Sequence, residues 1–294
     1  MRTFERLIYT NTQGVSVSFY PGALYHANIQ KDVTGLSDLT DTIYSTSSIG
    51  QHGDTLTGVR IEPREISIKG KIQASEKASY LSLRRALVGV LNPELAGTLH
   101  YEYGDYKRKI MAVTDGAPKF THANIYEEFE VDFKCPSPFW EEEQNTSKEI
   151  ASWIGGWTFP CKIDITNGMC FGEREESVIS DIYNPGHVST GMKIQFRALG
   201  RLSTPQLLNI NTREFIKVNQ TMEAEDLITV NTSYGSKTAT LLRGGASTNI
   251  FRSVDVDSTY MQLEVGDNVF RYDAAEGLDN LVCTVIFSPM YLSI

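Results

Sequence analysis

Apolar and polar residues alternate along much of the chain with a period of two. Residues 15–19 and 65–72 both place an apolar side chain at every second position, which is typical of strands that bury one face. Gly, Asn, Asp and Pro separate the alternating segments, and this spacing predicts a mainly β protein built from barrels or sandwiches. The other apolar positions of the pattern are Leu99, Tyr101, Tyr103, Phe129, Val131, Phe133, Ile163, Ile165, Met192, Ile194, Phe196, Ile228, Val230, Met261, Leu263 and Val265.

One segment, residues 76–91, has the period of a helix instead. Ser75 is a candidate N-cap, and Pro93 ends the segment because proline disfavours helical geometry at the residue before it. The first half is therefore predicted to be β with one packed helix, whereas the second half has no comparable pattern. The predicted buried face of the helix consists of Tyr80, Leu83, Leu87, Val90 and Leu91.

A domain boundary is predicted near residues 140–150. Pro136 and Pro138 interrupt strand pairing, and residues 141–149 contain no large apolar side chain. We therefore expect one domain over residues 1–142 and a second over 143–294, each of ordinary domain size. Within the first, the long polar stretch 26–58 is read as a protruding arm or hairpin, with a flexible surface loop as the alternative.

The charge balance excludes several classes of protein. The 294 residues carry 27 Lys and Arg against 36 Asp and Glu, a formal net charge of −9. This disfavours a protein that grips nucleic acid or anionic lipid, since both need clustered cations. With 41% hydrophobic residues and no apolar run of membrane-spanning length, and no secretory signal at the start, we expect a soluble protein made in a cytoplasm, without a membrane anchor.

The residue types that carry chemistry form no recognisable constellation. The five histidines are scattered, and the phosphate-binding, nucleophile-elbow and zinc-protease motifs are absent. We therefore expect no enzyme activity, no cofactor and no metal. Of the four cysteines, Cys161 and Cys170 are close enough to bridge a hairpin, while reduced, buried thiols are the commoner outcome; the others are Cys135 and Cys283.

Two weaker signals leave alternatives open. Acidic pairs such as Asp255 with Asp257, or the acids of residues 173–176, have a spacing that glycoside hydrolases use, although solvated surface acids fit equally. Trp153, Trp157 and Phe159 suit either a sugar-stacking platform or anchors in a domain core.

An ordered series of short motifs resembles the distal tail protein (Dit) family of siphoviruses, the long-tailed, non-contractile phages. In the first half the series is IGQHG (49–53), IEPREISI (61–68), LNP (91–93), GTLHY (97–101) and CPSPFW (135–140). In the second half it is IYNPG (182–186), PQLLN (205–209) and LEVGDN (263–268). The resemblance spans nearly the whole chain.

The resemblance implies a two-domain structural hub of a phage tail tip. The N-terminal domain would be a ring-forming, β-barrel-like unit with a helix, and the C-terminal domain a galectin-like β-sandwich. Six copies would form a ring that joins the tail tube protein to the tail-associated, receptor-facing protein and lets DNA pass without binding it. The protein would be made in the bacterial host cytoplasm and end at the virion tail tip. Some relatives carry inserted sugar-binding modules, but this chain of 294 residues, without a domain-sized insertion, resembles the short form of the family, which argues against direct binding of host sugar.

The resemblance also selects candidate residues. Arg64 and Glu65 are predicted to be a fold-specifying or ring-contact pair, with ordinary solvent-facing charges as the alternative. Trp140 is predicted to pack at the domain junction; Gly53, Pro138 and Phe139 complete the candidate set. The alternative functions are a carbohydrate-binding protein that uses the C-terminal sandwich for host adsorption and, less favoured, a glycoside hydrolase.

Overall fold

The structure is a computed structural model and describes residues 5–73, 77–122, 126–150, 153–154, 173–174 and 179–294. The chain divides into two units. The first contains Met1–Glu143 together with Met290–Ile294, and the second contains Gln144–Pro289. The predicted division at 142/143 placed the last five residues in the second domain. They belong instead to the first, because strand β26 (Met290–Tyr291) pairs with β12 (Trp140–Glu142) and buries Tyr291 there.

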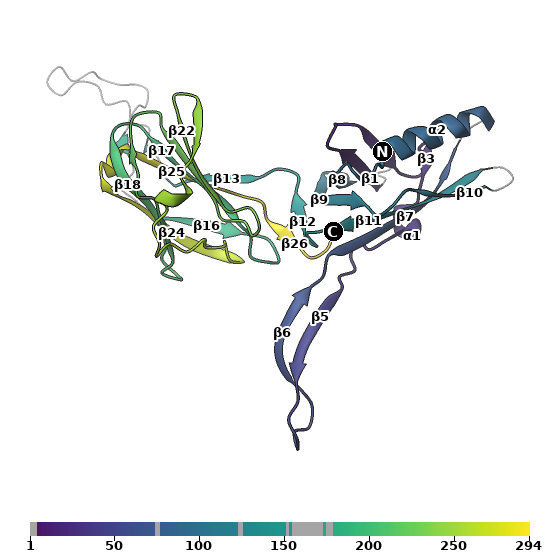
Figure 1. Ribbon diagram of the computed structural model, residues 1–294, viewed down its shortest axis with the longest axis horizontal. Coiled ribbons are helices and arrows are strands. Elements are labelled where there is room, and N and C mark those ends of the chain that lie inside the picture. The colour runs from purple at the N-terminus through teal and green to yellow at the C-terminus, as the bar shows by residue number, and fades with distance from the viewer. Residues whose placement is uncertain (1–4, 74–76, 123–125, 151–152, 155–172, 175–178) are drawn as a thin grey trace, which may run out of the picture. The chain divides into compact units, whose positions relative to one another are not determined.

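Seven strands of the first unit close into a barrel (Figure 1). Around the barrel the order is β11-β7-β3-β2-β1-β8-β9, and a short pairing between β9 and β11 closes the ring. The alternating pattern explains how these strands form the wall of the barrel, because one face of each strand is buried. Strands β7 and β11 bury every second side chain, including Ile66, Ile68, Val131 and Phe133. The barrel strands are β1 (Arg6–Asn11), β2 (Ser16–Phe19), β3 (Tyr25–His26), β7 (Arg64–Ile72), β8 (Gly97–Tyr103), β9 (Tyr106–Thr114) and β11 (Glu127–Cys135).

One long helix packs on this unit, as predicted. Helix α2 (Lys77–Val90) buries Leu87, Val90 and the following Leu91 against the barrel core, with Tyr80 and Leu83 packed beside them. The Leu91 amide still donates to the Leu87 carbonyl, so the helix ends just before Pro93. Ser75, the predicted N-cap, lies outside the described residues. The remaining elements of the unit are α1 (Ile29–Asp32), β4 (Val33–Thr34) and β10 (Lys119–His122).

The polar stretch after His26 contains a hairpin that leaves the barrel wall. Strands β5 (Asp41–Thr46) and β6 (Thr55–Ile61) pair with each other as a separate two-stranded sheet, visible in Figure 1 as a projection from the barrel. The hairpin prediction is confirmed.

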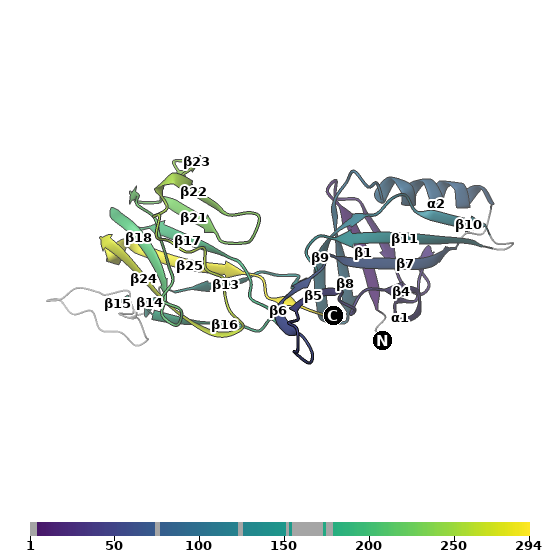
Figure 2. The same ribbon diagram turned by 60° about the horizontal axis from the view of Figure 1, so that its bottom comes forward.

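The second unit is a two-layer β-sandwich, in agreement with the predicted fold class. A six-stranded sheet, β13-β25-β17-β21-β22-β23, faces a five-stranded one in which β16, β24, β18 and β19 run side by side and β20 pairs with β18 (Figure 2). Phe196, Phe270 and Val285 lie in the core between them. The strands are β13 (Thr146–Glu149), β16 (Ile179–Asn184), β17 (Met192–Ala198), β18 (Leu202–Asn209), β19 (Phe215–Lys217), β20 (Thr221–Met222), β21 (Leu227–Asn231), β22 (Thr238–Arg243), β23 (Ala246–Asn249), β24 (Gly266–Glu276) and β25 (Leu281–Phe287).

Some elements of the second unit differ from the alternating pattern. Residues 261–265 were expected to form a strand, but only Leu263 makes an isolated bridge, to Thr190, and β24 begins at Gly266. Met261 and Leu263 are nevertheless buried, so the pattern identified the core residues but not the pairing. A short pair, β14 (Trp153–Ile154) with β15 (Glu173–Arg174), and two 3₁₀ turns, η1 (Phe251–Ser253) and η2 (Leu278–Asn280), complete the described elements.

Candidate functional site

A buried arginine holds together three distant segments of the first unit. Arg64, at the start of β7, is only 2% exposed. Its Nε donates to the Pro138 carbonyl at 2.8 Å, and its Nη2 donates to the carbonyl of Leu292 at 2.5 Å. Its Nη1 lies 2.8 to 3.0 Å from three further carbonyl oxygens, those of residues 35, 36 and 38. The guanidinium thus links the segment before the hairpin, the segment before β12 and the C-terminal residues.

The backbone around Gly35 has the conformation that brings its carbonyls to the Arg64 guanidinium. Gly35 has φ +86°, and a Cβ there would collide with the Glu65 carbonyl, so the segment passes close to β7 only because position 35 is glycine. Burial lowers the pKa of Arg64 from its ordinary value. Because the pKa of free arginine is so high, the group stays charged, and the five carbonyl dipoles replace its lost hydration.

Trp140 lies in the same cluster. Its side chain is fully buried in the barrel core, and its Nε1 donates to the Leu36 carbonyl at 3.0 Å, an oxygen that Arg64 also contacts. Pro138 and Phe139 are half-buried beside it. The CPSPFW segment is therefore a connection between the barrel and β12, and Trp140 anchors it in the barrel unit.

Replacing Trp140 with alanine should destabilise the first unit without preventing assembly. Truncating a buried tryptophan costs about 3–5 kcal/mol through lost contacts and the cavity left behind, and the Leu36 carbonyl loses one of its donors. Chemical denaturation of the full chain should show the first unit unfolding at lower denaturant concentration. Phe139→Ala, at a half-buried neighbour, is the matched control with a smaller loss; an unchanged Trp140→Ala midpoint would contradict the anchoring role.

The other candidate residues lie apart from this cluster. Glu65 is exposed and faces Lys134 across the β7–β11 pair, so it is a surface charge. Gly53 lies in the connection between β5 and β6, with φ +78° and open space around it. The structure thus joins Arg64, Pro138 and Trp140, and separates Glu65 and Gly53 from them. The interior position of Arg64 fits the fold-specifying role rather than a ring contact.

The hairpin carries an exposed apolar face that the pattern of its residues did not reveal. Ile43 and Val59 are paired directly and are 64% and 56% exposed. A register shift between Tyr44 and Ser45 then pairs Ser45 with Leu56, which is 63% exposed. Side chains two apart on a strand share a face, so the bulge brings Leu56 to the side of Ile43 and Val59. Without the bulge, Leu56 would point the other way, which is why alternation alone missed this face.

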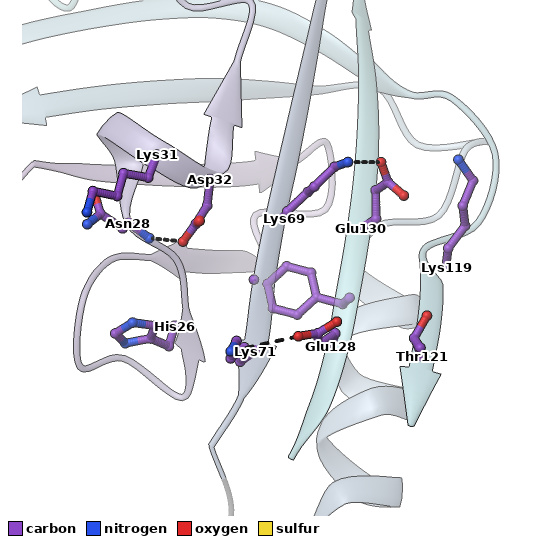
Figure 3. A pocket seen from close by; sticks show the side chains of 12 residues that line it. His26, Asn28, Lys31, Asp32, Lys69, Lys71, Lys119, Thr121, Glu128 and Glu130 are labelled. Carbon is purple, nitrogen blue, oxygen red and sulfur yellow. Dashed lines mark hydrogen bonds and ion pairs between the residues drawn. The ribbon is translucent and has the colours of Figure 1, made fainter. Parts of the chain in front are cut away.

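A groove on the barrel wall is lined by charges of both signs, and two pairs of them are in contact (Figure 3). It has a volume of about 610 Å³ and lies beside α1, β7, β10 and β11. Lys69 contacts Glu130 at 3.2 Å and Lys71 contacts Glu128 at 3.7 Å, both across the β7–β11 pair. Opposite charges facing each other along two strands leave little net potential, so this groove is a poor site for a phosphate chain.

Comparisons with known proteins match both units. A family described as phage tail protein RIFT-related domain matches residues 25–135, and a siphovirus-type tail component, C-terminal domain, matches residues 185–291. Together these matches span well over half of the chain. The chain belongs to the siphovirus distal tail protein family. It is thus a structural component of a phage tail.

Solved structures agree with the fold of this distal tail protein. The crystal structure of the phage SPP1 Dit protein, a hub of the adsorption apparatus, is 12% identical, with a TM-score of 0.70 over 97% of this chain and 98% of that one. The phage P2 baseplate in its activated conformation matches over 100% of both chains at 15% identity, with TM-scores of 0.56 in the calcium form and 0.54 in the strontium form. No curated protein sequence matches.

The acidic pair Asp255 and Asp257, which the sequence suggested for catalysis, does not have the expected arrangement on a strand. Asp255 and Asp257 lie in a turn rather than on a strand, and the Asp255 carboxylate accepts from Asn219 at 3.1 Å and contacts Lys217 at 3.4 Å. The hydrogen bond from Asn219 is the largest cause that lowers the pKa of Asp255. Asp255 therefore has partners of its own, which hold it in this turn.

The cysteines and the other sequence candidates are accounted for only in part. Cys135 and Cys283 are free, buried thiols, and burial raises the pKa of Cys135 to about 12, far from a reactive thiolate. In the part of the chain that the structure describes, no group of His, Cys, Asp and Glu could hold a metal ion, and no helix is long and apolar enough to cross a membrane. Cys161, Cys170, Trp157 and Phe159, the acids at 175 and 176, and the side chains of Trp153 and Glu173 lie outside the described residues.

Proposed function

We propose that this distal tail protein forms a hexameric ring that joins the tail tube to the receptor-facing tail protein and surrounds the path of the DNA, without catalysis. The observation that carries the proposal is the hairpin β5–β6. A two-stranded hairpin with three exposed aliphatic side chains on one face is marginally stable alone and gains by being covered. A neighbouring copy is the partner that a closed ring would supply.

Helix α2 carries a second, different surface, on which two exposed aliphatic side chains flank the exposed Arg84 and Arg85. Leu81 and Val88, seven residues apart on α2, are 57% and 40% exposed and lie on one side of the helix. In a head-to-tail ring each copy presents one patch to its left and another to its right, so a self-complementary surface is not expected. We assign the hairpin face to one side of the contact and the outer face of α2 to the other.

The proposed six copies and axial partners follow the expectation drawn from the resemblance in the sequence. The SPP1 relative is described as a hub of the adsorption apparatus and the P2 relative as part of a baseplate, which supports the same place in the tail for this chain. The net charge of −9 fits a ring that DNA crosses without adhering.

Light scattering on the full chain tests the ring. The expected mass is six times the 32.8 kDa of one chain. The double variant Ile43→Ser with Val59→Ser should shift the mass to the monomer, since each buried aliphatic side chain contributes about 1.5–3 kcal/mol and losing two weakens a contact more than a hundredfold. Both residues are exposed in the monomer, so the fold should survive.

Tyr44→Ser provides the control for that double variant. Tyr44 is exposed on the opposite face of the same hairpin, opposite Gly58. Its loss should leave the hexamer intact. A wild-type chain that stays monomeric at high concentration, or a double variant that still forms the hexamer, would contradict the assignment of the hairpin.

A further inference from the structure

Three aromatic rings and a lysine form a cluster at the surface of the second unit. Phe251 begins η1, Tyr260 lies in the segment before β24, and Tyr234 and Lys237 lie around the turn between β21 and β22. The rings of Phe251 and Tyr260 stack at 5.8 Å with an angle of 15°. The Lys237 ammonium is 5.1 Å from the Tyr260 ring centre and 5.8 Å from that of Tyr234.

The stacked pair of rings is attached to the sandwich core through buried neighbours, and part of it is exposed to solvent. Ile250 and Met261, the chain neighbours of the two rings, are buried, and Tyr260 itself packs against the sandwich core. The Phe251 amide donates to the Asn249 side chain at 2.9 Å, which fixes the start of η1. Phe251 is nevertheless 46% exposed. Because its ring lies nearly parallel to that of Tyr260, the exposed Phe251 side chain is oriented before any ligand arrives.

Tyr234 joins the stacked pair through the Lys237 ammonium, which lies near both the Tyr234 and the Tyr260 ring. Tyr234 is 78% exposed, so most of its ring is available to a ligand. Lys237 and Arg252 are exposed as well and supply N–H donors at the margin. The nearby carboxylate of Asp255 is occupied by Lys217 and Asn219. The cluster therefore offers exposed aromatic rings together with exposed N–H donors that a polar ligand can reach.

We propose that Phe251, Tyr234 and Lys237 form a binding platform for a pyranose saccharide. The C–H groups on one face of a pyranose ring make a flat apolar surface that matches an aromatic face, while its hydroxyl groups accept hydrogen bonds from the ammonium and guanidinium. A stable protein partner usually covers about 800 Å² on each side, and a few exposed rings set among polar side chains offer much less. A small, partly apolar ligand is the better match.

The platform differs from a groove elsewhere on this unit. A groove of about 470 Å³ on the six-stranded sheet is lined by polar and aliphatic side chains, including Gln195, Arg197 and Leu227, and its lining residues include no aromatic ring. A ring-stacking ligand therefore has its partners at the platform rather than in this groove. Single sites of this kind bind weakly, and six copies in the proposed ring would raise the avidity on a polysaccharide surface; the site itself does not depend on the ring.

Saturation-transfer NMR on the full chain tests the platform. Two probes separate the ligand classes: laminarihexaose as a neutral oligosaccharide and a hyaluronan hexasaccharide as an acidic one. We expect transfer to the ring protons of at least one probe. Phe251→Leu, which keeps the apolar volume but removes the flat face, should weaken binding about tenfold, and Lys237→Ala should weaken the acidic probe more than the neutral one.

Tyr183→Ala is the matched control, since Tyr183 is an exposed tyrosine on β16 of the same unit and lies outside the cluster. It should leave binding unchanged, and circular dichroism checks that each variant is folded. The proposal is overturned if neither probe shows transfer, or if folded Phe251→Leu binds as well as the wild type. Because this measurement is made at each single site, a failure of hexamer formation would not alter its outcome.

Discussion

Replacing Arg64 with alanine is expected to destabilise the first unit by at least about 4 kcal/mol, a large part of the stability of an ordinary domain. The change removes five hydrogen bonds from a charged donor at once and leaves the carbonyls of residues 35, 36 and 38, of Pro138 and of Leu292, which are buried or partly buried, without this partner. The free energy of unfolding, from urea titration followed by circular dichroism, measures the loss.

Two variants separate the geometry of Arg64 from its charge. Arg64→Lys keeps the charge but has no planar fork that can reach carbonyls on three segments, so we expect a loss close to that of alanine. Arg60→Ala, on exposed β6, removes an arginine that forms a surface ion pair with Glu62 at 3.6 Å and should change the free energy of unfolding by less than about 1 kcal/mol. An Arg64→Lys chain as stable as the wild type would refute the role of the fork.

Deleting the last five residues, Met290–Ile294, is expected to have a comparably large effect on the barrel unit and almost none on the sandwich. The deletion removes β26, the buried Tyr291 ring that stacks 4.0 Å from the Arg108 guanidinium, and the Leu292 carbonyl that Arg64 binds. Truncating a buried aromatic alone costs about 3–5 kcal/mol. Calorimetry should show the transition of the first unit moved to lower temperature and that of the second unchanged.

Tyr291→Phe is the control for this deletion. It removes only the hydroxyl, which donates to Glu142 at 2.8 Å, and keeps the strand and the ring. Burial is the largest cause that raises the pKa of Tyr291 to about 12, so the hydroxyl stays protonated at neutral pH and the expected loss is that of one hydrogen bond, about 1 kcal/mol. A deletion that shifts both transitions equally would contradict the assignment of these residues to the first unit alone.

The sequence by itself determined several of the elements and the class of fold. Alternation in residues 65–72 and 129–135 identified β7 and β11, and the period of Leu83, Leu87 and Val90 identified the buried face of α2. These features are local: whether a side chain faces the core is set by its position in a repeat of two or 3.6 residues, and the repeat can be read without knowing the partner.

Only the tertiary structure decided how distant segments join. Arg64 was a candidate from the sequence, but its partners lie 26 to 228 residues away and are backbone carbonyls, which every residue possesses and no side-chain pattern marks. The return of Met290–Ile294 to the barrel, and the bulge that turns Leu56 toward Ile43, depend likewise on which strands pair and in what register. Pairing and register are fixed by packing across the whole unit, because a slip of one residue reverses every side chain. The hydrophobic pattern therefore specified which segments would become strands or a helix. Long-range backbone contacts specified how those elements pair and which side chains stay exposed.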